Sequence, residues 1–496
     1  MNYANILKEI KPTKEEIAKV HNIANNVLET IDKIAKEENI SVQPSLVGSI
    51  AKGTWLSGSS DIDIFINFPL ETSENELKEK GLFLAYKTSE AIGGVAEEHY
   101  ASHPYITTKF EGSEIDIVPC YDIKTAEELK SAVDRTILHT NYILKNLKEK
   151  QKDEVILLKK FMKEIGVYGS EFKVGGFAGY LCEILILNYG TFENTLKNSS
   201  LWKKRTIIDL ENYKTEELFD DSLIAIDPTD KNRNVGAALK TQKMGEFIAG
   251  SRNFIDNPKI EYFKPIKKDK KNLNPSNIFK KFKDRESKTL ILSFNIPDIS
   301  IDNLYPQLNK TAVSLKEKLK HEEFNVIDTS YWTDENKIAI ILIELDTWTH
   351  SKYQIHEGPK IWNKKASDEF LAIYGNRCYL QDEHWVLKRS RQNKTPEDFI
   401  NFVLKRENIA ILKIGKNLKD IVIDTYNLID IEDLFSKFTD SINENENEND
   451  FDFDNSSDNF IDSNNSNNSH NFLYKGNIDF LNFLEDYLNP GQKIKR

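Results

Sequence analysis

Cysteine is scarce in this chain, which has only three in 496 residues. Cys120, Cys182 and Cys378 are far apart and show neither metal-ligand spacing nor a disulfide framework. Long hydrophobic runs are also missing, since stretches such as 338–345 are far shorter than the roughly 20 residues that span a bilayer. No basic-then-apolar signal pattern is present at the start. These absences favour a cytoplasmic protein in a reducing compartment, with no membrane partner.

Basic residues are absent from one acidic stretch. Residues 440–470 contain nine Asp or Glu and no Lys or Arg, and without those nine charges the net charge would be −3 instead of −12. Net charge therefore does not exclude a nucleic-acid partner. The composition of 440–472, mostly Asn, Asp, Ser and Glu, predicts disorder. An amphipathic helical pattern resumes at 478–488, so we interpret this stretch as an internal insertion.

The length is too great for one hydrophobic core, and changes of pattern predict three parts. Residues 1–145 mix helical and strand patterns, which predicts an α/β unit on a small mixed sheet. Residues 146–258 are the second part, in which the pattern from 150 to 250 is helical and Arg233 is expected to start a helix after a turn at Asp227 and Pro228. Residues 259–496 follow a β-α-β-β order, which predicts an α+β region. The fold class is therefore a multidomain combination of α/β and α+β architecture.

Acidic residues occur on two predicted strands of the first part. Asp61 and Asp63 alternate with three isoleucines, which places the acids on one face of a strand and the apolar residues on the other. A second alternating strand contributes Asp116. Neighbouring carboxylates repel each other unless a cation lies between them, and an all-oxygen site of this kind suits Mg²⁺ shared with substrate phosphates.

A Gly-Ser turn precedes the first acidic strand. Gly48 and Ser49 lie between a predicted strand and a short helix, where backbone N–H groups and a helix N-terminus can hold a phosphate. Lys52, one turn later, can reach the same oxygens. Each feature alone is more often a plain surface turn, a solvated lysine or a pair of exposed acids. Together with a third carboxylate they favour two-metal phosphoryl chemistry on a nucleoside triphosphate.

Longer blocks carry a specific resemblance. GSIAKGTWLSGSSDIDIFINFP at 48–69 and EIDIVPCY at 114–121 resemble the polymerase-beta-like nucleotidyltransferases, and six further blocks resemble the archaeal-type, class I CCA-adding enzymes among them. The further blocks are EEHYASHPY (97–105), SAVDRTILHT (131–140), LLKKFMKEIGVYGSEFKVGGFAGYLCEILILNYGTF (157–192), DPTDKNRNVGAAL (227–239), LYPQLNKT (304–311) and HEGPKIW (356–362). The resemblance extends from the first helix to about residue 400.

The resemblance implies a role for residues that match the family pattern. It implies metal-binding carboxylates at Asp61, Asp63 and Asp116; ATP or CTP contacts at Gly48, Ser49, Lys52, Thr136, His139, Lys159 and Tyr168; a base-reading Arg233; and contacts with the tRNA end at Tyr100 and His103. The family often has Glu at the position of Asp61 and more commonly has Arg at that of Lys52, where a lysine gives a point contact rather than a bidentate one.

The resemblance also implies a function: template-independent addition of CCA to the tRNA 3′ end from CTP and ATP, with release of pyrophosphate and with Mg²⁺ as the metal. It implies a catalytic head at 1–145, a central domain at 146–258 that completes the nucleotide pocket, a tRNA-binding region at 259–496, possible repair of damaged ends and a homodimer. The alternatives are a poly(A) polymerase or other RNA-tailing enzyme that uses ATP alone and, as a distant third, a non-catalytic RNA-binding protein. The basic run at 264–285 would ordinarily be a solvated face, but beside such a site it is expected to meet RNA phosphates.

Overall fold

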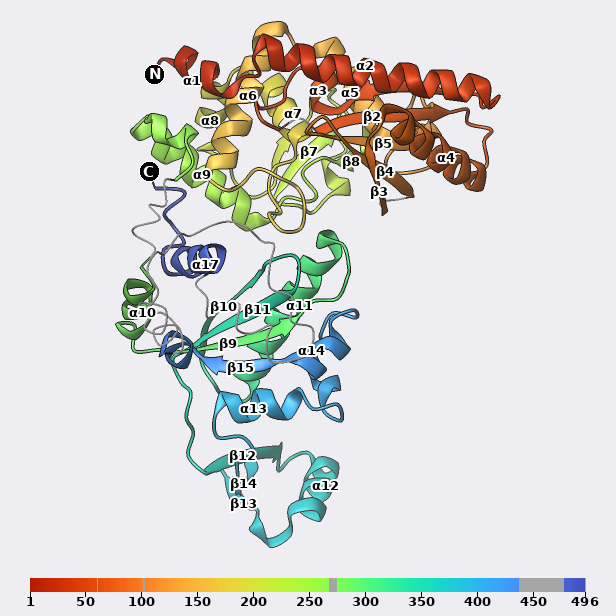
Figure 1. The fold of residues 1–496 in the computed structure, drawn as a ribbon. Coiled ribbons are helices and arrows are strands. Elements are labelled where there is room, and N and C mark those ends of the chain that lie inside the picture. The colour runs from red at the N-terminus through yellow and green to blue at the C-terminus, as the bar shows by residue number, and fades with distance from the viewer. Residues whose placement is uncertain (60, 101–102, 267–273, 437–476, 496) are drawn as a thin grey trace, which may run out of the picture. The chain divides into compact units, whose positions relative to one another are not determined.

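The computed structural model describes the chain except for residues 60, 101–102, 267–273, 437–476 and 496. The chain divides into two compact units (Figure 1): unit 1 contains Met1–Lys267 with Gly491–Arg496, and unit 2 contains Lys268–Pro490. The acidic insertion predicted at 440–472 lies outside the described residues. The helix predicted after it is confirmed as α17, Ile478–Leu488.

A five-stranded mixed sheet contains the acidic strands of unit 1. Its strand order is β1 (Gln43–Val47), β2 (Asp61–Phe68), β5 (Ser113–Tyr121), β4 (Pro104–Phe110), β3 (Val95–Tyr100). The β2–β5 pair is parallel, whereas the other neighbouring pairs are antiparallel. The sequence pattern predicts β2 and β5 correctly but does not predict the edge strand β3, whose residues are largely polar and exposed.

Two long helices cover one face of this sheet. The α2 helix (Lys14–Glu37) and the α4 helix (Glu74–Ile92) share a hydrophobic cluster with the isoleucines of β2 and β5 (Figure 1). A capping box starts α2, because the side chains of Thr13 and Glu16 each accept the other residue's backbone N–H. Since the isoleucines occupy the face under the helices, Asp61 and Asp63 lie on the opposite face of β2.

The remainder of unit 1 is a helical layer with its own hydrophobic core. At its centre is α7 (Gly179–Tyr189), in which Leu181–Ile186 are all buried, as a helix that is apolar on most sides requires. The other helices of unit 1 are α1 (Tyr3–Ile10), α3 (Gly48–Lys52), α5 (Arg135–Asn146), α6 (Glu149–Glu164), α8 (Phe192–Ser199) and α9 (Thr241–Asp256), with 3₁₀ turns η1 (Ala126–Glu128), η2 (Glu216–Leu218) and η3 (Ile260–Phe263).

The helical pattern predicted for residues 150 to 250 does not extend over the whole range. A small sheet interrupts the helices, with the order β6 (Thr206–Ile208), β7 (Leu223–Asp227), β8 (Asp230–Asn234). Arg233 therefore lies on a strand and not at the start of a helix. The Asn234 side chain accepts the Ala225 N–H at 2.8 Å and donates to the Leu223 carbonyl at 2.9 Å. Such side-chain bonds to backbone compete with helix formation and stabilise the hairpin.

Unit 2 contains two further sheets. The larger is antiparallel, with the order β10 (Val326–Thr333), β11 (Ile338–Leu345), β9 (Lys288–Asn295), β15 (Asn427–Asp430), and the smaller has the order β12 (Tyr353–Lys360), β14 (His384–Ser390), β13 (Tyr379–Gln381). The β-α-β-β order predicted from the sequence is confirmed by β9, α11 (Ile301–His321), β10 and β11. The other described helices of unit 2 are α10 (Pro275–Lys283), α12 (Lys364–Tyr374), α13 (Pro396–Val403), α14 (Lys419–Thr425) and α17, with 3₁₀ turns η4 (Gly375–Arg377) and η5 (Ile409–Ile411).

A buried carboxylate connects α17 to the larger sheet of unit 2. Glu344 on β11 is fully buried and accepts hydrogen bonds from Arg285 Nε at 2.6 Å, Ser287 Oγ at 2.6 Å and Tyr487 Oη at 2.6 Å. Burial alone would raise the pKa of Glu344, but these donors lower it. Lys281 also forms an ion pair, with Glu485 at 2.7 Å. Two members of the basic run, Arg285 and Lys281, therefore form ion pairs with acids of unit 2.

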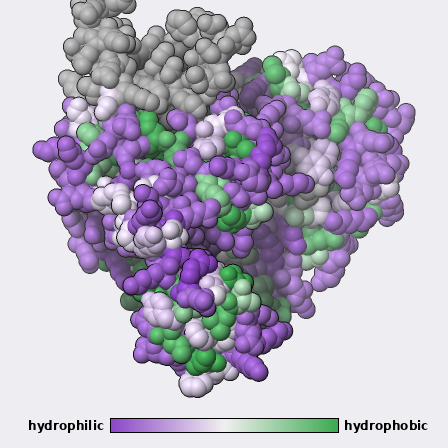
Figure 2. Space-filling model, turned by 90° about the horizontal axis from the view of Figure 1, so that it is seen from below, coloured by the Kyte–Doolittle hydropathy of each residue, from purple (hydrophilic) through white to green (hydrophobic). Residues whose placement is uncertain are grey.

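Hydrophilic side chains cover most of the face shown in Figure 2, and hydrophobic residues gather there in small patches. Exposed apolar side chains in the smaller sheet of unit 2 and its helix include Ile355, Ile373 and Leu380, each about half or more exposed. Of the helices in the described part of the chain, none combines the length and the apolar character needed to cross a membrane.

We expect Glu344→Gln to lower the free energy of unfolding by about 2 kcal/mol. The substitution replaces a charged acceptor by a neutral amide, and that acceptor has four donors: Nε and NH2 of Arg285, Ser287 Oγ and Tyr487 Oη. The measurement is the denaturant midpoint of the full chain. The matched control is Glu357→Gln, whose side chain is 70% exposed and has His384 at 3.7 Å as its ion-pair partner. The control should change the free energy of unfolding derived from the midpoint by less than about 0.5 kcal/mol. Equal midpoints for the two variants would contradict the role given to Glu344.

Candidate active site

Three aspartates lie on one face of the parallel strand pair in unit 1. Asp63 on β2 and Asp116 on β5 are partners in register, and Asp61 is two residues before Asp63 on the same face. Asp61 is exposed, whereas Asp63 and Asp116 are partly buried. The structure therefore brings together on one face the three acids that the sequence pattern places on two strands.

Gly48 opens α3 in direct contact with this acidic face. Its backbone has φ +72°, and a Cβ at this position would lie 1.9 Å from Oδ2 of Asp63. The Gly48 N–H donates to Oγ1 of Thr140 at 3.3 Å, and Ser49 follows as a half-buried residue. Glycine is therefore required here for two reasons: the left-handed backbone and the close approach of a carboxylate.

The acidic face carries unbalanced negative charge. Burial, followed by the charges of Asp116 and Asp61, raises the pKa of Asp63 to about 7. Burial also raises the pKa of Asp116, although Thr107 donates a hydrogen bond to its Oδ1 at 2.6 Å. In the described residues, no three His, Cys, Asp or Glu side chains converge closely enough to hold a metal ion as they stand. Three carboxylates on one face are nevertheless the all-oxygen donor set that a hard divalent cation prefers.

Two lysines share one buried carboxylate in the same unit. Lys52 Nζ lies 2.6 Å from Oε2 of Glu183 on α7, and Lys159 Nζ on α6 lies 3.5 Å from Oε1. Thr54 donates its hydroxyl to Glu183 Oε1 at 2.6 Å and accepts Lys159 at its carbonyl oxygen at 3.0 Å. All four side chains are buried. Burial alone would raise the pKa of Glu183, but the two lysines lower it, so it stays a carboxylate.

A second buried carboxylate gathers three more side chains. Asp227 Oδ2 lies 2.7 Å from Arg233 NH1 and 2.8 Å from His139 Nε2, and its Oδ1 accepts the Tyr180 hydroxyl at 3.2 Å. His139 is stacked on Tyr180, with ring centroids 3.8 Å apart. Burial raises the pKa of Asp227 taken alone, but His139 and Arg233 together bring it well below its ordinary value.

A cavity of about 400 Å³ opens beside this second carboxylate. It is lined by residues of α5, α7 and β8 and by residues of the segments beside them: His139, Ser170, Ala178, Tyr180, Phe219, Asn232, Arg233, Asn234, Val235, Ala237 and Ala238. Two residues predicted from the sequence, His139 and Arg233, therefore face one cavity. Its size suits a nucleobase with part of a ribose.

The other residues predicted from the sequence lie in varied positions. Tyr168 is half-buried. Its hydroxyl and Lys159 Nζ both lie beside Gly179, since a Cβ added there would be 3.2 Å from the hydroxyl and 3.4 Å from Nζ. Thr136 is half-buried in the first turn of α5. Tyr100 is 73% exposed at the end of β3. His103 is instead buried, with its Nε2 hydrogen-bonded to a backbone carbonyl of β5, so contact with an RNA end would require that bond to open.

Sequence reasoning missed Glu183 and Asp227. Glu183 is the single charged residue of the apolar helix α7, GYLCEILILNY. Asp227 ends the apolar strand LIAID. A charged residue is almost never fully buried unless it is paired, so an acid within an apolar segment was the available signal.

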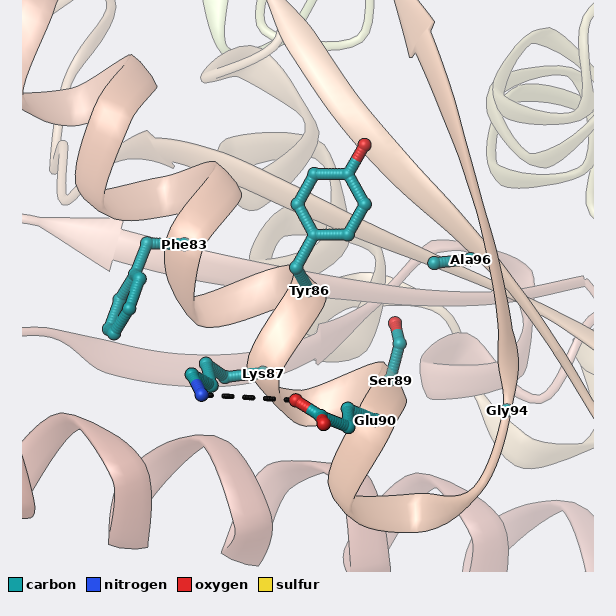
Figure 3. Close-up of a pocket in the computed structure, with 7 residues that line it drawn as sticks. All are labelled: Phe83, Tyr86, Lys87, Ser89, Glu90, Gly94 and Ala96. Carbon is teal, nitrogen blue, oxygen red and sulfur yellow. Dashed lines mark ion pairs between the residues drawn. The ribbon is translucent and has the colours of Figure 1, made fainter.

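Another cavity of about 450 Å³ lies between α4 and β3 (Figure 3). Its lining residues are Phe83, Tyr86, Lys87, Ser89, Glu90, Gly94 and Ala96. The dashed ion pair in Figure 3 joins Lys87 Nζ to Glu90 Oε2 at 3.8 Å. None of the predicted site residues lines this cavity, and no role is assigned to it.

Comparisons with known proteins identify the chain segment by segment. Family models match residues 28–139 as a nucleotidyltransferase domain, 153–264 as a tRNA nucleotidyltransferase second domain and 285–430 as a CCA-adding enzyme C-terminal domain. The first match confirms the predicted nucleotidyltransferase fold with its mixed sheet. A solved structure of a cytoplasmic RNA terminal U-transferase has a TM-score of 0.42 at 14% identity, covering 53% of this chain and 96% of that chain.

Curated relatives are similar over most of their length. The CCA-adding enzyme of Methanothermobacter thermautotrophicus is 44% identical over 84% of this chain and 90% of its own. Those of Methanosarcina barkeri and Methanocaldococcus jannaschii are 34% and 37% identical, over 86% and 76% of this chain and 92% and 84% of their own. The chain therefore belongs to the CCA-adding enzymes, a family of tRNA nucleotidyltransferases.

Proposed function

We propose that this enzyme adds CCA to the 3′ end of tRNA, joining two cytidylates from CTP and then one adenylate from ATP without a template. The observation that supports this most strongly is that three groups of side chains meet around α3 in unit 1. They are the face with Asp61, Asp63 and Asp116, the buried lysine pair, and the cavity with Arg233. The start of α3 approaches Asp63 at Gly48, and Lys52 Nζ at its end lies 5.8 Å from the ring centroid of Tyr180 in the cavity lining. The three groups supply, in turn, side chains for a metal, for a triphosphate and for a base.

The acidic face would hold the divalent metal. Asp61, Asp63 and Asp116 are the proposed ligands, and Mg²⁺ when bound supplies charge neutralisation and a more acidic attacking hydroxyl. The 3′-hydroxyl of the tRNA attacks the α-phosphorus of the nucleotide, the bond to the β-phosphate oxygen breaks, and pyrophosphate leaves. The protein's part in phosphoryl transfer of this kind is mainly positioning and electrostatic stabilisation.

The lysine pair would bind the triphosphate. Lys52 donates to Glu183, and the other two N–H groups of its ammonium are the proposed donors to phosphate oxygens. The Nζ of Lys159 already faces Glu183 and both oxygens of Thr54, so a phosphate contact by Lys159 would require one of these contacts to open. Ser49 and the backbone at Gly48 start a helix whose N-terminal end favours an anion. Thr136, His139 and Tyr168 are the proposed ribose and triphosphate contacts.

Unit 2 and the residues near Tyr100 are the proposed tRNA-contacting parts. A double-stranded acceptor stem is read mostly by shape and by phosphate contacts, so no base-specific pocket is needed there. Three functional parts, at 1–145, 146–258 and 259–496, remain the proposed division of labour, and a homodimer, a cytoplasmic location and repair of damaged CCA ends remain predictions. The second candidate is an RNA-tailing enzyme that uses ATP alone.

The nucleotide requirement is the first test. We expect the full chain to add two cytidylates and one adenylate to tRNA that lacks CCA, in the presence of Mg²⁺. Each labelled nucleotide is supplied singly and then together, and products are resolved by length. The control is tRNA that already ends in CCA. Extension with ATP alone into a long tail, without use of CTP, would establish the tailing enzyme instead.

The acidic face is tested by Asp63→Ala. Loss of the central carboxylate should lower incorporation by at least about 100-fold, because the charge that develops in the transition state loses its metal. The same variant should lose any rise in unfolding temperature that Mg²⁺ gives to the parent chain, a readout independent of activity. Asp122→Asn is the matched control, since Asp122 follows β5 and pairs with Lys124 at 2.7 Å in an exposed position. Undiminished incorporation by Asp63→Ala would remove the catalytic assignment.

Gly48→Ala separates the two reasons for glycine at this position. Gly48 and Gly58 have φ of +72° and +74°, but an added Cβ meets Asp63 at Gly48 and nothing within 4 Å at Gly58. Both substitutions should cost roughly 1 kcal/mol of stability through the backbone. We expect Gly48→Ala alone to lower the incorporation rate by at least about 10-fold, because it displaces the Asp63 carboxylate. Similar rates for the two variants would show that the close contact is unimportant.

A further inference from the structure

Asp227 is saturated by hydrogen-bond donors that belong to the protein. Besides Arg233, His139 and Tyr180, the amide and hydroxyl of Thr229 donate to its Oδ1 at 2.9 and 2.8 Å. Five donors on two fully buried oxygens leave no acceptor capacity for a bound molecule. Asp227 can therefore influence a ligand only through the side chains that it holds.

Arg233 is one of the side chains that donate to Asp227, and it lines the cavity. Its guanidinium is planar, so the 2.7 Å hydrogen bond from NH1 to Asp227 Oδ2 anchors one end of the group and restricts the directions in which the remaining N–H donors point. The side chain is 34% exposed and lines the cavity beside His139 and Tyr180. Without this anchor, an arginine on the short strand β8 would populate several rotamers.

The same carboxylate determines the tautomer of His139. Burial lowers the pKa of His139, although Asp227 and its hydrogen bond oppose this. A carboxylate only accepts, so the proton of the neutral ring lies on Nε2, which is 2.8 Å from Asp227 Oδ2. Nε2 is thus a donor to Asp227 and not an acceptor for Arg233, 3.4 Å away. The Arg233 donors are not used up by His139.

A guanidinium in a fixed orientation discriminates between bases, because it presents donors only. Cytosine and adenine each have an unprotonated ring nitrogen beside the exocyclic amino group, and this nitrogen accepts a hydrogen bond. Uracil and guanine have a protonated ring nitrogen at the corresponding place, which faces a guanidinium donor unfavourably. A guanidinium that can turn loses this difference, since it can find carbonyl oxygens on uracil and guanine instead.

We propose that Asp227 is the positioning residue that sets base selectivity in this cavity, through the orientation it imposes on Arg233. The inference rests on the proposed function, because it requires the base of the incoming nucleotide to occupy the cavity. It assigns to Asp227 no contact with substrate. Its predicted signature is a loss of selectivity rather than a uniform loss of activity.

The experiment compares CTP with UTP on tRNA that lacks CCA, using the full chain and its Asp227→Asn variant. The measured quantity is the ratio of kcat/KM for CTP to that for UTP in the first addition. We expect Asp227→Asn to lower this ratio by at least about 10-fold. Asp221→Asn is the matched control, because Asp221 accepts Asn234 Nδ2 at 2.8 Å and braces the same hairpin without lining the cavity.

A double-mutant cycle tests whether Asp227 acts through Arg233. Arg233→Lys should lower the same ratio, and adding Asp227→Asn to it should change the ratio by less than about twofold. A role in folding alone would lower kcat/KM for CTP and UTP equally and leave the ratio unchanged. Asp227→Glu keeps the charge but moves the carboxylate by one methylene, so it provides a second measurement should the asparagine variant not fold, and it should also lower the ratio.

The outcomes separate this inference from the function on which it rests. If the unmodified chain does not extend tRNA with CTP and ATP, the proposed function fails and the inference fails with it. If the unmodified chain does so and the folded Asp227 variants keep its ratio, only the inference is overturned. A lower ratio in Asp221→Asn of the same size would also overturn it, since selectivity would then depend on the hairpin as a whole.

Discussion

The buried contact between Glu183 and two lysines is the interaction on which the site of unit 1 depends. Lys52 belongs to α3, Lys159 to α6 and Glu183 to α7, so one carboxylate joins the acidic sheet to the helical layer. Without it, two buried like charges would repel each other and neither would have a compensating partner. Because all three side chains are nearly inaccessible to water, the attraction is weakly screened and the relative position of these elements is well determined.

This contact also determines what the neighbouring acids can do. Asp61, Asp63 and Asp116 repel an approaching triphosphate, and the lysines oppose that repulsion only if they remain close to the acidic face. Burial and the neighbouring acids raise the pKa of Asp63, and the charge of Lys52 partly opposes this rise. Gly48 permits this proximity, since its missing side chain lets the start of α3 touch Asp63. Acids, lysines and turn thus form one electrostatic unit rather than three adjacent motifs.

The sequence predicted the parts of this site whose signal is local. The alternation of Asp61 and Asp63 with isoleucines predicted β2 and its two faces, and the Gly-Ser turn predicted the helix start that follows β1. Arg233 was expected to start a helix after the turn at Asp227 and Pro228. The strand there instead depends on Asn234, whose side chain reaches back to β7. A bond between a side chain and a distant backbone leaves no periodic signal in the sequence.

The three buried carboxylates show more generally what can and cannot be predicted from the sequence. Glu183, Asp227 and Glu344 each stand in an otherwise apolar segment, so the sequence alone indicates that each must have a buried partner. Their partners, however, are far along the chain: Lys52 is 131 residues from Glu183, His139 is 88 from Asp227, and Arg285 is 59 from Glu344. The need for a partner is therefore local information, whereas the identity of the partner is tertiary. The position of Arg233 belongs to the second kind, because Asp227, to which it donates, is itself held by His139 from another part of the chain.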